Sequence, residues 1–205
     1  NAYYFFKSAL TPEQCDKIIN LGNDEINRIK KAGGTAEATT FGDNHKQGLE
    51  KAGKKAIPQE DKTIEEIKKD LGDNNANIEN NRYIRDSEVS WLNDEWLYDL
   101  IHPFLRTANE QAGWQYEWDF SESFQFTKYH KGGFYGWHAD GNSCNLSKYK
   151  RYIPGVSPVA EDGSMPKGYT DNHNMVGKVR KLSMTINLNK PGEYDGGNLK
   201  FDFGP

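Results

Sequence analysis

The spacing of apolar residues changes after Gly113, and this change constrains the fold more than any other feature of the chain. Before Gly113, two segments repeat apolar residues at the spacing of one helix face. After Gly113, apolar and polar residues alternate as they do along a β-strand. Helices followed by strands predict an α+β fold in which the strands form a sandwich or a jelly roll.

The first helical segment opens with the letters TPEQ. Thr11 suits the N-cap, Pro12 suits the first helical position, and Gln14 is placed to complete a capping box. Apolar residues then keep the helical spacing until Gly33 and Gly34. The pattern therefore predicts a helix between these limits, with one face packed against another element.

A second helix is predicted from about Asn93 to Ala112, with Pro103 kinking it. Between the two helices, residues 33–81 are rich in lysine, glycine and asparagine, which predicts a surface insertion with one short helix near residues 63–71. The chain of 205 residues is long enough for one core, and we expect a single domain over residues 1–205.

Three later stretches alternate as strands do. In FSESFQFTKY an aromatic face alternates with a polar face that ends in Tyr129, and the pair Gly132-Gly133 predicts a turn after it. RKLSMTINLN, which starts at Arg180, and the segment 199–203 are predicted to be further strands. Residues 141–179 between them are expected to form a lid-like loop.

Composition narrows the function classes. The 26 basic and 30 acidic residues give a net charge of -4, which argues against a nucleic-acid-binding surface. No apolar run approaches the ~20 residues of a membrane helix, and no signal peptide is recognisable at the start. Two cysteines are too few for a disulfide framework or a thiolate metal cluster. We therefore expect a cytoplasmic protein that acts on small molecules or proteins, without a nucleic-acid or membrane partner.

His138 and Asp140 stand two positions apart just after the turn, so on a strand they would project to one side. A histidine at a strand end beside a solvated aspartate would also give this pattern. An imidazole and a carboxylate on one side of a strand nevertheless supply two ligands for a divalent metal. A second histidine from another strand would complete the facial triad of non-haem Fe(II) oxygenases.

The motifs together resemble a known family. SFQFTKYHKGGFYGWHADG and RKLSMTINLNKPGEYDGGNLKF are similar to 2-oxoglutarate and Fe(II) dependent dioxygenases of the prolyl 4-hydroxylase class, including the bacterial and phage PKHD-type hydroxylases. NRYIRDSEVSWLNDEWLYDLI, from Asn81 to Ile101, resembles them more loosely. The resemblance implies a double-stranded β-helix (jelly-roll) core flanked by the N-terminal helices. It allows a phage-encoded protein, but the sequence does not determine the source.

The resemblance also implies roles for individual residues. It implies that His138 and Asp140 are iron ligands, and that the Tyr129 hydroxyl binds a carboxylate of 2-oxoglutarate. The side chains expected to line the cosubstrate pocket are Ser183 and Thr185. Those expected at its mouth, where they would touch substrate, are Tyr135 and Trp137, although both could equally be core aromatics. Arg180 would contact substrate or pair with an acid, and we favour the acid; Cys144 is expected to be a bystander.

Two family features are missing from this sequence. The second iron-binding histidine and the basic residue for 2-oxoglutarate follow the Gly-Gly-x-Leu strand in the family, so we expect them beyond Pro205. His173 is the only histidine after His138, and it lies in the predicted loop of residues 141–179. A ligand on such a loop would be poorly preorganised, and whether His173 can serve stays open.

The implied reaction uses Fe(II), 2-oxoglutarate and O2, with ascorbate as a candidate reductant. It couples decarboxylation of 2-oxoglutarate to succinate with hydroxylation of a C–H bond, and the favoured target is a prolyl residue in a peptide or protein. Two alternatives stay open. The chain could hydroxylate a free amino acid, a nucleobase or another small molecule, or it could be a noncatalytic jelly-roll binding module.

Overall fold

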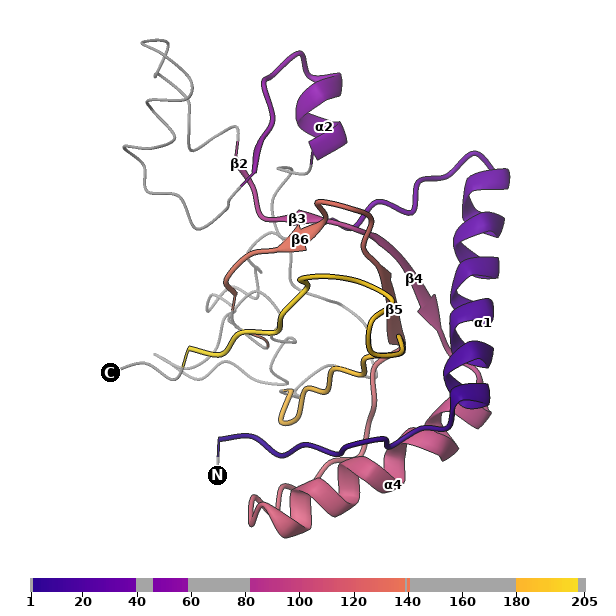
Figure 1. Cartoon of the computed structure of the whole chain (residues 1–205), viewed down its shortest axis with the longest axis vertical. Coiled ribbons are helices and arrows are strands. Elements are labelled where there is room, and N and C mark those ends of the chain that lie inside the picture. Colours follow the sequence, from indigo (N-terminus) through magenta and orange to yellow (C-terminus); the bar gives the residue numbers. More distant parts are fainter. Residues whose placement is uncertain (1, 40–45, 59–81, 139, 141–179, 203–205) are drawn as a thin grey trace, which may run out of the picture. The chain divides into compact units, whose positions relative to one another are not determined.

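The computed structural model describes residues 2–39, 46–58, 82–138, 140 and 180–202. Within these ranges the chain is a mixture of helices and short strands (Figure 1). The elements in chain order are α1 (Pro12–Lys31), α2 (Lys46–Lys51), β1 (Ile57–Pro58), β2 (Arg82–Tyr83), β3 (Arg85–Asp86), β4 (Glu88–Leu92), α4 (Glu95–Gln111), β5 (Phe124–Lys128) and β6 (Phe134–Tyr135). In the described ranges no helix is both long enough and apolar enough to cross a bilayer.

The chain divides into two compact units. Unit 1 consists of Asn1–Leu21, Leu92–Phe124 and Ala139–Pro205. Unit 2 consists of Gly22–Trp91 and Gln125–His138. Each unit is therefore built from segments that are distant in the sequence. One boundary between the units falls directly after His138, so His138 is assigned to unit 2 and Asp140 to unit 1.

Helix α1 confirms the prediction from the TPEQ motif. The Gln14 amide donates to the Thr11 hydroxyl (3.2 Å) and the Thr11 amide donates to the Gln14 side chain (2.8 Å), which is a complete capping box. At the other end Gly33 has φ +80°, and the Gly34 amide reaches back to the carbonyl of Ile29 at 3.0 Å. This is a Schellman closure, in which glycine takes the left-handed position at no steric cost.

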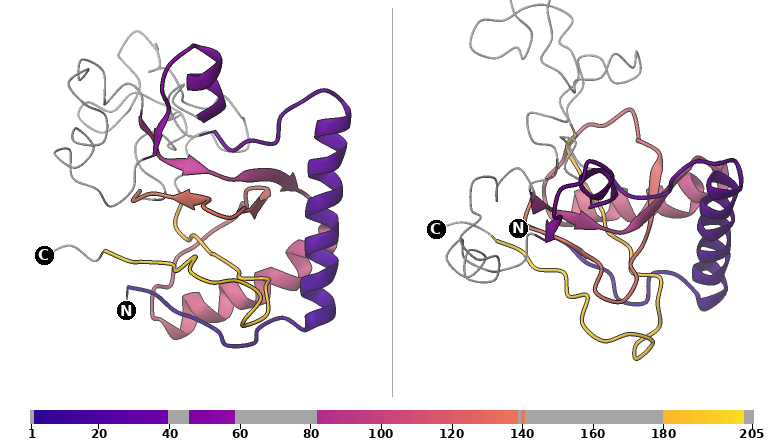
Figure 2. Two further views of the ribbon diagram at one scale, coloured as in Figure 1. Left: turned by 45° about the horizontal axis from the view of Figure 1, so that its top comes forward. Right: turned by 90° about the horizontal axis from the view of Figure 1, so that it is seen from above.

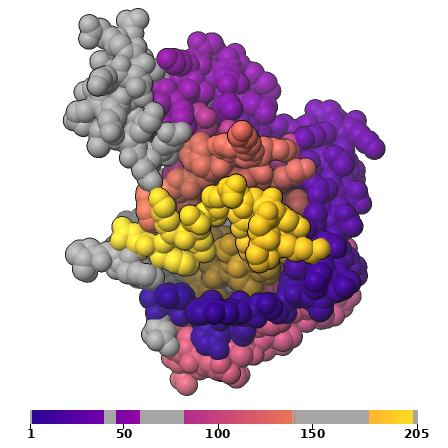
Figure 3. Space-filling model, in the orientation of Figure 1, coloured from indigo at the N-terminus to yellow at the C-terminus, as the bar shows by residue number. Residues whose placement is uncertain are grey.

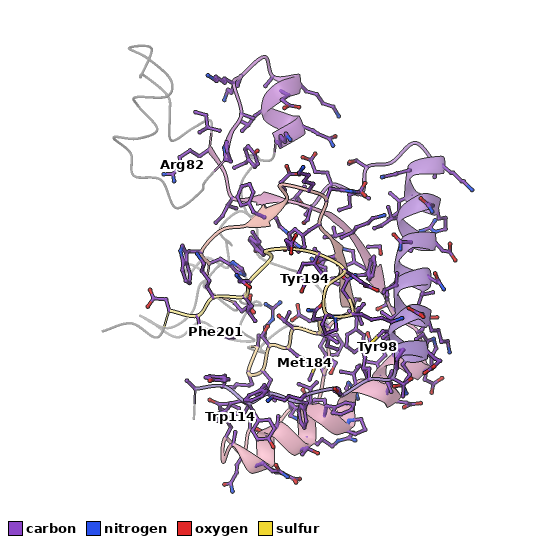
Figure 4. The ribbon with its side chains drawn as sticks, in the orientation of Figure 1. Arg82, Tyr98, Trp114, Met184, Tyr194 and Phe201 are labelled. Atoms are coloured by element: carbon purple, nitrogen blue, oxygen red, sulfur yellow. The ribbon has the colours of Figure 1, made fainter. Side chains whose placement is uncertain are left out.

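Helix α4 confirms the second predicted helix, and it buries Leu97, Ile101 and Ala108. The N-terminal segment runs along it (Figures 1 and 2), where the Phe6 ring meets the Phe104 ring edge-on at 5.2 Å. The ring of Tyr98, labelled in Figure 4, packs on Phe124 with centroids 4.7 Å apart. These contacts pack α4 against the N-terminal segment and Phe124 within unit 1; the kink at Pro103 stays a prediction.

The strands pair two by two. β1 and β2 are parallel, with Ile57 opposite Arg82. β3 and β6 are antiparallel, with Arg85 opposite Tyr135, and β4 pairs with β5. Each sheet formed by the described residues has two strands, and these sheets do not close into a barrel.

The described part of the lysine-rich segment 33–81 packs into unit 2. The Ala38 amide donates to the Ser87 carbonyl at 2.8 Å, and the Val89 amide donates to the Ala36 carbonyl at 2.7 Å. Both alanines are buried, and so is Leu49 of α2. The small side chains of Ala36 and Ala38 allow the backbone of this segment to lie close to β4. The helix predicted near residues 63–71 and the loop predicted at residues 141–179 lie outside the described residues.

The predicted strands after residue 180 require a correction, because no residue of the described segment 180–202 belongs to a strand. The alternation does appear in burial, since Leu182, Ile186 and Leu188 are half-buried between exposed neighbours. Leu199 and Phe201, however, are 64% and 56% exposed, and this segment forms the yellow surface seen in Figure 3. Alternation decides which side chains turn inward, whereas a strand also needs a partner backbone for its hydrogen bonds. β5 is likewise shorter than the predicted stretch 120–129.

Gly22 allows α1 to pack on β5 within unit 2. A Cβ atom at this position would lie 2.2–2.5 Å from ring atoms of Phe126. We therefore expect Gly22→Ala to lower the free energy of unfolding by about 1–3 kcal/mol through overpacking, despite the better helix propensity of alanine. Urea denaturation of the variant measures this loss.

Asn20→Ala, on an exposed position of the same helix, is the control and should not destabilise. Adding Phe126→Leu to Gly22→Ala should cost less than the sum of the two single changes, because the smaller side chain relieves the overlap. Strict additivity would show that the ring and the helix backbone are not in contact.

Candidate functional site

His138 follows β6 closely, and the short segment between them orients its ring. The Gly136 amide donates to the Ile84 carbonyl at 2.8 Å, which fixes the chain beside β3. The Nδ1 atom of His138 lies 2.8 Å from the Gly136 carbonyl oxygen. A carbonyl can only accept, so Nδ1 carries the hydrogen and the neutral ring keeps its lone pair on Nε2. His138 is exposed, and Nε2 is therefore the nitrogen that could bind a metal.

Tyr135 lies directly against His138. The two rings are stacked with centroids 3.7 Å apart and an interplanar angle of 11°. Tyr135 is 37% exposed and Trp137 is 50% exposed, so neither is a core aromatic of unit 2. The structure thus brings together His138 and one of the two residues predicted to touch substrate.

Asp140 is exposed and belongs to unit 1. Its Oδ2 atom accepts a short hydrogen bond from the Ser183 hydroxyl. Two of the predicted site residues, one from each motif, therefore meet inside unit 1. Thr185 is exposed two positions further along the chain.

Arg180, at the start of the same segment, forms a two-pronged ion pair with Glu122, with nitrogen–oxygen distances of 2.7 and 3.0 Å. The prediction that Arg180 pairs with an acid is confirmed. The predicted bystander Cys144 and the open candidate His173 lie outside the described residues.

Arg85 is a functional candidate that the sequence analysis did not single out. It lies on β3 with only 6% of its surface exposed. Its Nε donates to the Ser87 hydroxyl at 2.9 Å, and its Nη2 donates to the Gln125 side chain at 2.8 Å and to the Thr127 hydroxyl at 3.1 Å. Gln125 and Thr127 belong to the polar face of β5 that the alternation predicted. The alternation predicted a polar face on β5, but it did not predict that Arg85 binds to this face.

Arg85 also connects two of the predicted site tyrosines. Its guanidinium carbon lies 4.5 Å from the centre of the Tyr135 ring, within the range of a cation–π contact. Desolvation of the Tyr129 hydroxyl raises its pKa, while the nearby charge of Arg85 and a hydrogen bond from it act in the opposite direction. Tyr129 still keeps 48% of its surface exposed. Unit 2 therefore presents His138, Tyr135, Arg85 and Tyr129 as one connected set of side chains.

Glu88 on β4 anchors the residue after Tyr129. Its Oε2 accepts from His130 Nε2 at 2.8 Å, and Lys30 pairs with its other oxygen. Burial alone would raise the pKa of Glu88, but the hydrogen bonds from Lys30 and His130 outweigh it, so the pKa is lowered. The carboxylate is ionised at neutral pH and ties α1, β4 and the end of β5 together.

The donor chemistry fits part of a facial iron triad. An unprotonated imidazole nitrogen and a carboxylate are ligands that Fe(II) takes in such sites. Three or more clustered His, Cys, Asp or Glu side chains suitable for a metal are not found among the described residues. A surface hollow of about 510 Å³, lined by His102, Arg106 and residues 116–119 of unit 1, contains none of the predicted site residues.

No family model, curated protein or solved structure matches the chain.

The lowered pKa of Glu88 predicts a pH dependence of stability. A depressed carboxyl pKa stabilises the fold above the unfolded value of about 4.3, and this contribution disappears as the pH falls through the folded pKa. We expect Glu88→Gln to be less stable than the wild type at pH 7 by on the order of 1 kcal/mol. The difference should shrink towards pH 3.

Urea denaturation between pH 7 and pH 3 measures the free energy of unfolding of both proteins. Glu110→Gln, at an exposed position of α4, is the control and should follow the wild type at every pH. A difference between Glu88→Gln and wild type that stays constant down to pH 3 would contradict the assignment.

Proposed function

We propose that the protein is a non-haem Fe(II) dioxygenase that couples decarboxylation of 2-oxoglutarate to succinate with hydroxylation of a substrate C–H bond. The favoured substrate is a prolyl residue in a peptide or protein. The proposed core is a jelly roll, to which the paired strands of unit 2 would belong. The observation that carries the proposal is the orientation of His138, whose Nδ1 is engaged by the Gly136 carbonyl so that Nε2 is free of a proton.

His138 Nε2 and the Asp140 carboxylate would hold the iron. Bound Fe(II), with 2-oxoglutarate and O2, supplies the oxidising chemistry. Ser183 supports the role of Asp140, because its hydroxyl donates to Oδ2 and holds the carboxylate in one orientation. Hydrogen bonds of this kind orient metal ligands and tune their basicity.

The remaining residues would bind the organic reactants. Tyr129 has a partly exposed hydroxyl-bearing ring beside a buried cation, which suits a carboxylate of 2-oxoglutarate. Thr185, beside Ser183 in the chain, would line the same pocket. Trp137, the residue before His138, is 50% exposed, and an exposed aromatic face suits a prolyl ring. Tyr135 stacks on His138 and would touch the extended peptide with the exposed part of its ring.

The iron site is tested by anaerobic titration of the full-length protein with Fe(II) and 2-oxoglutarate. Chelation of the cosubstrate by ligated iron gives a visible charge-transfer band, and we expect this band in the wild type. His138→Ala and Asp140→Ala should abolish it. His130→Gln, which changes an exposed histidine bound to Glu88, is the matched control and should retain it. A wild-type protein without the band, or a His138→Ala variant with it, would exclude the proposed site.

The hydrogen bond to Asp140 gives a second prediction. Ser183→Ala should weaken Fe(II) binding by about 10–100-fold, the usual effect of removing an outer hydrogen bond to a metal ligand. Thr185→Val is the comparison variant. It should weaken the binding of 2-oxoglutarate and leave the affinity for Fe(II) unchanged. Metal titration with and without the cosubstrate separates the two effects. Equal metal affinities of Ser183→Ala and wild type would remove Ser183 from the site.

A further inference from the structure

The guanidinium of Arg85 is a buried cation whose hydrogen-bond partners in the described residues are neutral. Its acceptors are hydroxyl groups of Ser87 and Thr127 and the amide oxygen of Gln125, and Tyr129 takes a further hydrogen bond from it. A charged side chain that is 94% shielded from solvent normally pairs with an opposite charge. The arrangement holds Arg85 in place and leaves its charge uncompensated by these partners.

The acids closest to Arg85 in the sequence are engaged elsewhere. Asp86 is the next residue on β3, so its side chain points to the other face of the strand, where Lys46 lies 3.3 Å from its Oδ2. Glu88 is bound by Lys30 and His130. Among the described residues, the two acids next to Arg85 in the sequence are thus each held by other cations.

The neutral partners of Arg85 use only part of its donors. A guanidinium carries five N–H groups in a rigid fork, and three of them are used by Ser87, Gln125 and Thr127 through Nε and Nη2. Nη1 lies on the remaining arm, and it is not among the buried side-chain atoms without a partner in the described residues. The rings next to the fork, Tyr129 and Tyr135, are 48% and 37% exposed, so solvent reaches the two side chains that flank the cation.

We propose that Arg85 is the cationic centre of a carboxylate-binding site walled by Tyr129 and Tyr135. Ser87, Gln125 and Thr127 act as positioning residues that hold the fork in one orientation. A carboxylate would take a charge-assisted hydrogen bond from Nη1, the arm that Ser87, Gln125 and Thr127 do not use, and a second hydrogen bond from the Tyr129 hydroxyl. The carboxylate belongs either to the dicarboxylate cosubstrate or to an acidic group of the substrate. Whether the carboxylate comes from the cosubstrate or from the substrate rests on the proposed function. The carboxylate site at Arg85 does not depend on that function.

Isothermal titration of the metal-free full-length protein tests the site. The probes are glutarate, a proline-containing peptide with glutamate next to the proline, and the same peptide with glutamine in place of glutamate. We expect the wild type to bind glutarate or the acidic peptide, and to bind the glutamine peptide more weakly. Competition by 2-oxoglutarate for the glutarate signal identifies the cosubstrate as the source, and binding of the acidic peptide alone identifies the substrate.

Gln125→Glu is the decisive variant. It keeps the size of the side chain and an acceptor for Nη2, at an exposed position, but it places a carboxylate on Arg85. We expect affinity for the carboxylate probe to fall about tenfold or more, because the internal carboxylate competes for the charge. Arg85→Gln should lose binding altogether, with circular dichroism to check folding. Arg28→Gln removes one positive charge from the exposed ion pair with Glu25 and should bind as the wild type does.

Unchanged affinity in Gln125→Glu, or a wild type that binds none of the carboxylate probes, would overturn the inference. The result is separate from the test of the iron site. Carboxylate binding without a charge-transfer band would retain the Arg85 site and reject the dioxygenase proposal. A band without binding of glutarate or the acidic peptide would do the reverse.

Discussion

The buried guanidinium of Arg85 is the interaction on which the arrangement of unit 2 depends. A charge at this depth is costly unless its donors are hydrogen-bonded. Here Ser87, directly after β3, and Gln125 and Thr127 on β5 supply the oxygens. The same group contacts Tyr135 on β6. One side chain therefore requires three strands to be correctly placed, and it sets the positions of the tyrosines beside His138.

Features encoded by neighbouring residues were predictable from the sequence. The capping box of Thr11 and Gln14, the glycine end of α1 and the body of α4 follow from contacts three to five residues apart. The turn at Gly132 and Gly133 is of the same kind, since the Gly133 amide bonds to the carbonyl of His130. The polar face of β5 was predictable because a strand has a period of two.

Features that depend on a distant partner were not predictable. Segment 180–202 has the alternation of a strand without being one in the described structure, because pairing depends on a second backbone. The role of Arg85 was not predictable because its hydrogen-bond partners lie about forty positions away in the chain. The candidate site was predicted as a list of residues. Its internal order, in which Tyr135 stacks on His138 and Ser183 bonds to Asp140, required coordinates.

The contacts that orient His138 come from residues two and three positions earlier in the chain. Ordering a side chain normally costs conformational entropy at the moment a ligand binds. At His138 the ring is already held by Gly136 and Tyr135, so part of this entropy is lost on folding and not on binding. A metal ion would thus encounter a nitrogen that is already oriented, and a change at Ile84 or Arg85, which hold Gly136 and Tyr135, would disturb that orientation.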